Sequence, residues 1–280
     1  MKQVFRVFWG CTLAAALALT GCGRGGAPGS SGAGSMSGSG SGAMSGGTAG
    51  QEQAWRTGLG VVTEAAGSDR AGKITTAAAA VVLDADGKLA DVMLDELELS
   101  VSGGSTGSVT TPEDVRSKRT KGEDYPLAAA SSLGKGWAEQ ADWFADYLTG
   151  RTPDEVKKLK TDENGKPQDA DLVSGCTIAV DRYRDAVVRA CEQAKALGAA
   201  KGDTVSLNLL AADLPDDLTA TDDQDAHVQA DITLAALSVD SNGRVTSAIG
   251  DMTEPELTVS ADGTVSAPRE PVYTLSLIHI

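Results

Sequence analysis

Residues 171–177 have side chains and a spacing that could present a hydroxyl group to an anion. They read D-L-V-S-G-C-T, or D-x-x-S-G-x-T in short form, and an amphipathic segment follows them. The first backbone N–H groups of a helix have no partner inside it, and the helix dipole adds about half a positive charge at that end. A phosphate group binds readily at such a position. We therefore expect the hydroxyl of Thr177 to lie at the N-terminus of a helix.

The same residues resemble the D-x-x-S-G-A-T motif of a known family. This family comprises the FMN-binding domains of sodium-pumping NADH:quinone reductase, of Rnf complexes and of flavin lipoproteins. Its final threonine carries FMN through a phosphoester bond, which a separate flavin transferase forms. The resemblance thus implies FMN on Thr177, an attachment loop that includes Asp171, Ser174, Gly175 and Cys176, and a membrane electron donor. Cys176 departs from the pattern, since the family has alanine there. The resemblance implies an electron carrier more than an enzyme with turnover.

Other interpretations of the motif stay open. Ser174 and Thr177 could simply cap the next helix, because serine and threonine are common N-cap residues. The chain could also keep the topology of an FMN-binding domain without the flavin and act as a binding or structural lipoprotein. A hydrolase with Ser174 as nucleophile is disfavoured, because the sequence lacks a G-x-S-x-G elbow and a well-placed histidine.

The N-terminal residues predict export and a lipid anchor. Lys2 and Arg6 precede an apolar run over residues 7–19 that is too short to span a bilayer, as in a signal peptide. Residues 19–22, L-T-G-C, resemble a lipobox, which implies removal of residues 1–21 and a diacylglycerol on Cys22. We expect the chain to lie on the extracytoplasmic face of the membrane, held in the lipid bilayer by this group. Residues 22–50 are rich in glycine and serine and predict a disordered tether.

Charge and residue counts disfavour several functions. The net charge is -15, with 24 basic against 39 acidic residues, so nucleic acid is not an expected partner. No cysteine and histidine spacing typical of zinc sites occurs, and two distant histidines suggest no catalytic triad. The acidic residues within 213–225 could bind calcium, but a solvated linker is the favoured interpretation. Cys176 and Cys191 could form one disulfide.

The elements that must position the motif predict an α+β module over residues 51–200. Strand patterns over residues 57–63, 74–83 and 89–94, with a turn at 84–87, predict antiparallel hairpins. Shorter strands are expected over 96–101 and 107–111.

Helical periodicity begins after these strands. One apolar face predicts a helix that ends at Gly150, and residues 152–155 form the capping box of a second, short helix. A third helix is expected from about Asp181. The apolar residues of the first helix are Trp137, Ala141, Phe144 and Leu148, and those of the third are Tyr183, Val187, Ala190, Cys191, Ala194 and Leu197. Trp137, Trp143 and Tyr147 could stack on a flavin ring, but packing in the core is favoured.

Residues 201–274 predict a second copy of the hairpins. At an offset of 156 residues, Asp84 and Gly87 coincide with Asp240 and Gly243. No helices follow, so this module is interpreted as a truncated repeat of the β part, with apolar surface and strand edges exposed. Residues 275–280, L-S-L-I-H-I, resemble a translated sequencing adapter, and we interpret them as an artefact at the end of an incomplete gene product.

Overall fold

The structure, a computed structural model, describes residues 54–268 and 278–279. The predicted signal peptide, lipid anchor and tether, and most of the predicted adapter sequence, lie outside the described residues. All described residues belong to one compact unit that spans residues 50–280. None of the described helices has the length and apolar character needed to cross a bilayer.

The first sheet contains four antiparallel strands in chain order. They are β1 (Arg56–Ser68), β2 (Ala71–Leu83), β3 (Leu89–Gly103) and β4 (Val109–Thr110). The predicted hairpins are therefore confirmed, although β3 is one long strand where two short ones were expected. Strand β2 is alanine-rich because both of its faces are covered: every side chain from Ile74 to Leu83 is buried.

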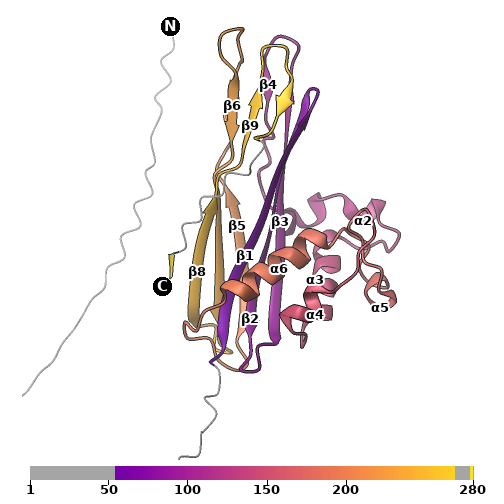
Figure 1. Cartoon of the computed structure of the whole chain (residues 1–280), viewed down its shortest axis with the longest axis vertical. Coiled ribbons are helices and arrows are strands. Elements are labelled where there is room, and N and C mark those ends of the chain that lie inside the picture. The colour runs from indigo at the N-terminus through magenta and orange to yellow at the C-terminus, as the bar shows by residue number, and fades with distance from the viewer. Residues whose placement is uncertain (1–53, 269–277, 280) are drawn as a thin grey trace, which may run out of the picture. The chain divides into compact units, whose positions relative to one another are not determined.

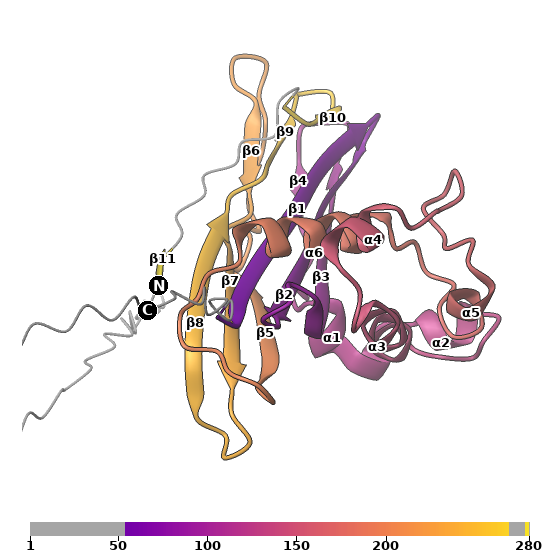
Figure 2. The same ribbon diagram turned by 60° about the horizontal axis from the view of Figure 1, so that its bottom comes forward.

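Helices cover one face of this sheet (Figures 1 and 2). The longer ones are α3 (Trp137–Leu148) and α6 (Asp181–Gln193), and both begin as the apolar periodicity predicts. Helix α4 (Pro153–Lys157) starts on the predicted capping box, with Thr152 as N-cap. The short helices are α1 (Lys118–Lys121), the 3-10 turn η1 (Gly122–Asp124), α2 (Leu127–Ala130) and α5 (Ala170–Val173).

Strands from the second half of the chain cover the opposite face. They are β5 (Thr204–Ala211), β7 (Ile232–Val239), β8 (Val245–Thr253) and β11 (Ile278–His279), in the order β11-β8-β7-β5. A smaller sheet, in the order β10-β9-β6, contains β6 (Ala226–Gln229), β9 (Glu256–Val259) and β10 (Val265–Ser266). The fold is thus mixed α+β with antiparallel sheets.

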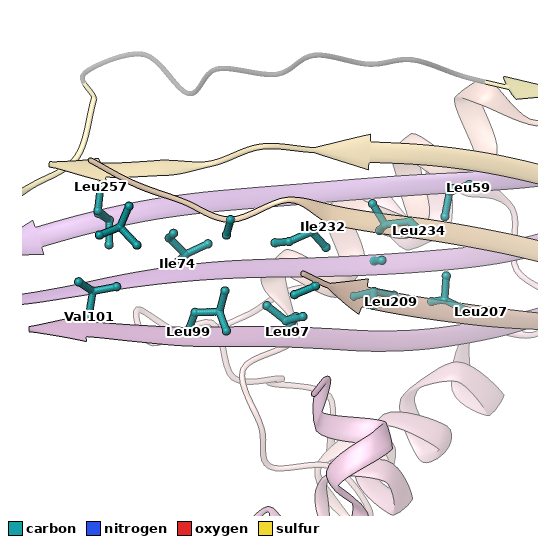
Figure 3. Packing of buried hydrophobic residues seen from close by; sticks show 14 of the residues in the cluster. Leu59, Ile74, Leu97, Leu99, Val101, Leu207, Leu209, Ile232, Leu234 and Leu257 are labelled. Carbon is teal, nitrogen blue, oxygen red and sulfur yellow. The ribbon is translucent and has the colours of Figure 1, made fainter. Parts of the chain in front are cut away.

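Apolar side chains of the two halves fill one shared core (Figure 3). Leu97 and Leu99 of the first sheet lie in the same cluster as Leu207, Leu209 and Ile232. The expectation that the second half exposes its apolar residues is wrong for this face. Alternate side chains of β5 and β7 are buried, because the first sheet provides the cover that helices were expected to provide.

The hairpins in the two halves pair in similar ways. The register of β2 against β3 shifts between Val82 and Leu83, and the register of β7 against β8 shifts between Ser238 and Val239. The Asp84 carboxylate accepts hydrogen bonds from the backbone N–H groups of residues 86 and 88, and the Asp240 carboxylate accepts them from residues 242 and 244. This geometry is that of an Asx turn, and for residues 84–87 it confirms the predicted turn.

Three buried hydroxyl groups join the two sheets. Thr57 Oγ1 lies 2.5 Å from Ser238 Oγ and 2.6 Å from Ser247 Oγ. We expect Thr57→Val to lower the free energy of unfolding by about 1–3 kcal/mol, because both serine hydroxyls lose this partner while they stay buried. Urea denaturation followed by circular dichroism measures the change. The exposed Thr110→Val is the control, and an equal effect in the two variants would contradict the prediction.

Candidate functional site

Thr177 lies in the loop between α5 and α6, away from either helix end. Helix α6 begins at Asp181 and its N-cap is Val180, so the expectation of a hydroxyl at a helix N-terminus is wrong. Ser174 and Thr177 do not cap that helix either. The physical reason is that the backbone N–H of Val180 donates to Gly165 O at 2.7 Å, which holds residues 176–180 outside the helix.

The hydrogen bonds of Thr177 converge on one side chain. Its backbone N–H and its hydroxyl both donate to Gln140 Oε1, at 2.9 and 3.1 Å. Gln140 is fully buried in α3, whereas Thr177 is half-buried. The hydroxyl is therefore held in one direction by a rigid element.

The other motif residues have different surroundings. Asp171 and Ser174 are exposed, and the Ser174 hydroxyl donates to Asp171 O at 2.7 Å. Gly175 lies against the Trp143 ring, where a Cβ atom would come within 2.1 Å of a ring carbon. Cys176 is fully buried in the helical core. Of these five predicted residues, only Thr177 lines the cleft described next.

A cleft of about 480 Å³ opens beside Thr177. It is lined by residues from β3, α1, α2, α3, α6 and the loops between them. Three cationic side chains, Lys118, Lys166 and Arg182, and three aromatic rings, Tyr125, Trp137 and Tyr183, are among its lining residues.

The aromatic residues differ from expectation in part. Trp137 is buried, as predicted, and its Nε1 donates to the hydroxyl of Tyr183 at 3.1 Å. The prediction of core packing is wrong for Trp143, which is 41% exposed and has Lys135 Nζ 4.8 Å from its ring centre. Tyr147 is half-buried beneath the guanidinium of Arg151.

A buried ion pair forms one wall of the cleft. Glu96 is fully buried on β3, and its Oε1 lies 2.5 Å from Lys118 Nζ. Arg182 Nη2 lies 3.7 Å from Glu96 Oε2. Burial lowers the pKa of Lys118, but the charge of Glu96 and hydrogen bonds to Glu96 and Tyr125 together outweigh burial, so the pKa is raised. Burial, with the charge of Glu96, also raises the pKa of Tyr183 well above its ordinary value.

Helix α1 is placed against β3 by a second buried carboxylate. Asp95 accepts hydrogen bonds from Ser117 Oγ at 2.7 Å and from the backbone N–H of Arg119 at 3.1 Å. Burial raises the pKa of Asp95, although these hydrogen bonds act in the opposite direction. This contact at the start of α1 brings Lys118 over Glu96.

Four residues of the site, Gln140, Glu96, Lys118 and Arg182, belong to none of the sequence motifs described above. One signal was present: Glu96 occurs two positions after Leu94, on the strand face that also carries the buried Val92. A carboxylate at such a position requires a cationic partner, because a buried charge without one is costly. The identity of that partner could not be read from local spacing.

Cys176 and Cys191 are free, buried thiols, so the possible disulfide between them is not formed. Burial raises the pKa of Cys176 to about 11 and that of Cys191 to about 12. A group whose pKa is higher in the folded than in the unfolded chain contributes its full stabilisation at pH values below the unfolded-state pKa, here 9.0. This contribution is lost as the pH rises through the folded-state pKa.

We therefore expect the free energy of unfolding to fall between about pH 9 and 12, and to fall less steeply in Cys176→Ala. Denaturant titrations at several pH values measure this slope. Thiol titration at pH 8 provides an independent check: both groups should react only after unfolding. Rapid reaction of either thiol in the folded protein would contradict the prediction.

Comparison of the chain with protein-family models, curated proteins and solved structures finds no match. Within residues 54–268, no three His, Cys, Asp or Glu side chains are grouped so that they could hold a metal ion.

Proposed function

We propose that the protein is an extracytoplasmic lipoprotein that carries FMN covalently on Thr177 and transfers electrons at the membrane. The observation that carries the proposal is the position of Thr177. This residue lines a cleft whose lining also includes three cationic side chains. The cleft volume of about 480 Å³ is within the range of small-molecule sites, about 300–1,000 Å³.

The charge of the cleft suits a phosphate-bearing ligand. Lys118, Lys166 and Arg182 outnumber Glu96 in the lining, but Lys118 also pairs with Glu98 and Arg182 with Glu64, each at 3.3 Å. The exposed Lys166 adds a positive charge to the lining, and a cationic side chain beside a cleft attracts anions. Lys166 is the residue that would face the flavin phosphate.

The aromatic lining suits the flavin ring. Tyr125 is half-buried under Lys118, whereas Trp137 and Tyr183 are buried and pack edge to face, with ring centres 5.9 Å apart. Bound FMN would supply reversible electron transfer, Tyr125 would orient its ring, and the two buried rings would help to exclude water from the cleft wall. The protein itself would then act as a carrier.

The replacement of alanine by Cys176 is compatible with this proposal. Its side chain points into the helical core and does not line the cleft. The exchange therefore changes core packing behind the loop and leaves the surface that faces the ligand unchanged.

We further propose that residues 51–200 form the flavin module, that residues 201–274 repeat its β part, and that Cys22 anchors the chain in the lipid bilayer. Support for the repeat comes from β-bulges at Val82/Leu83 and Ser238/Val239, which stand 156 residues apart. Positive-φ turns at Gly107 and Gly263 show the same offset.

The experiment co-expresses the chain with a flavin transferase and weighs the intact protein. We expect a mass increase of one FMN unit that is retained in Thr177→Ser and absent in Thr177→Ala, because only the latter lacks the hydroxyl that forms the ester. Ser132→Ala is the matched control, since it removes another hydroxyl from the same cleft. An unmodified chain, under conditions that flavinylate a known FMN-binding domain, would contradict the proposal.

A further inference from the structure

Gln140 is the buried side chain that connects Thr177 to the opposite wall of the cleft. Its Oε1 accepts both hydrogen bonds from Thr177, as described above. Its Nε2 donates to Ser131 Oγ and to Lys135 O, each at 3.0 Å. The two hydrogens and two lone pairs of the amide are thus all used. Since Ser131 and Thr177 both line the cleft, one amide holds two sides of it.

The orientation of this amide follows from its partners. The backbone N–H of Thr177 can only donate, and the carbonyl of Lys135 can only accept. A reversed amide would place hydrogen against hydrogen and oxygen against oxygen at these two contacts. The Thr177 hydroxyl therefore directs its hydrogen at Gln140 Oε1, and its lone pairs are left for other partners.

We propose that Gln140 is a positioning residue for phosphoryl transfer onto Thr177, an inference that rests on the proposed function. In the step concerned, Thr177 Oγ1 forms a bond to the phosphorus of an FMN unit that is activated as a pyrophosphate. The bond from that phosphorus to the leaving nucleotide breaks, and the nucleotide departs with the electron pair. The hydroxyl proton passes to a base of the transferase, because an amide such as Gln140 does not accept it.

The role of Gln140 is to fix the direction of the attacking oxygen before the transferase binds. Side-chain rotation would otherwise move Thr177 Oγ1 among three rotamers. Gln140 is itself held by α3, by Ser131 and by Lys135, so it restricts this rotation from a rigid base. A misplaced reacting group typically costs a factor of about 100 in rate.

The test compares Gln140→Leu, Gln140→Asn and Gln140→Glu in the full chain. Leucine removes the acceptor and asparagine is one methylene too short to reach. Glutamate keeps an acceptor for Thr177 at the same distance but replaces the Nε2 group that donates to Lys135 O. Attachment rates are measured by intact mass at saturating transferase and flavin dinucleotide. We expect attachment to be about 10- to 100-fold slower in the leucine and asparagine variants and partly restored in the glutamate variant.

Hydrogen exchange in the protein without flavin is the second measurement. The Thr177 amide should exchange roughly fivefold faster in Gln140→Leu and Gln140→Asn, because its hydrogen bond is lost. A folded leucine or asparagine variant with the parent attachment rate, or with unchanged exchange at Thr177, would overturn the inference. If Thr177 exchanges faster in the variants but the parent chain never takes up flavin, the proposed function is rejected, and the inference with it.

Discussion

Gly60→Ala is expected to lower the free energy of unfolding by about 3 kcal/mol, at the upper end of the range for overpacking in a core. A Cβ atom at this position would lie 2.1 Å from Ala186 O and 2.4 Å from Ala190 N. These are backbone atoms of α6, which crosses β1 directly (Figure 1). The helix would have to move off the sheet, because backbone atoms cannot rotate away as a side chain can.

The matched control is Gly250→Ala, also in a strand. Its Cβ atom would meet nothing nearer than Leu234 O at 3.9 Å. This variant should keep the parent stability or gain up to about 1 kcal/mol, since glycine weakens a strand interior. Urea denaturation of both variants gives the comparison, and equal stabilities would show that α6 does not pack against β1 as described. Arg182 and Tyr183 lie in the first turn of α6 and line the cleft, so Gly60→Ala should also disturb the cleft.

Lys118→Met is expected to cost about 3–5 kcal/mol of stability, because it leaves the Glu96 carboxylate buried without its nearest charge partner. Arg182, at 3.7 Å, is too far to replace a contact of 2.5 Å. The double variant Glu96→Leu/Lys118→Met should lose less than Lys118→Met alone, since it removes both charges together. Thermal or urea unfolding of the single and double variants measures the coupling between them.

Arg116→Met, in an exposed pair with Asp114, is the control and should leave the stability near that of the parent. The pH dependence supplies a further check. The pKa of Lys118 is raised above 10.5, so its contribution is complete below pH 10.5 and is lost only as the pH rises above that value. A double variant as unstable as Lys118→Met would contradict the assignment of the cost to an unpaired charge.

Local patterns were sufficient for most of the secondary structure. The capping box at Thr152, the Asx turn at Asp84 and the apolar stripes of α3 and α6 depend on residues only a few positions apart. Such patterns act through backbone hydrogen bonds and burial of one face, so they survive whatever the rest of the chain does. The prediction that Thr177 lies at a helix N-terminus was wrong because it depended on a contact outside the local pattern. Gly165, 15 positions away, accepts the hydrogen bond from the backbone N–H of Val180.

The surroundings of the motif depended on packing between distant segments. Gln140 reaches Thr177 across 37 positions, and Lys118 reaches Glu96 only because Asp95 holds the start of α1. The spacing of residues in the chain contains no information on such pairs, since each depends on where a loop returns to the sheet.

By itself, therefore, the sequence determined the strands, the main helices, the turns and the choice of Thr177 as the residue to test. Only the tertiary structure decided that this threonine lines a cleft, that Gln140 directs its hydroxyl, and that the second half covers the first sheet. The physical reason is range: backbone conformation and amphipathic periodicity are determined over a few residues. A site and a shared core, in contrast, form where faces from distant parts of the chain exclude water together.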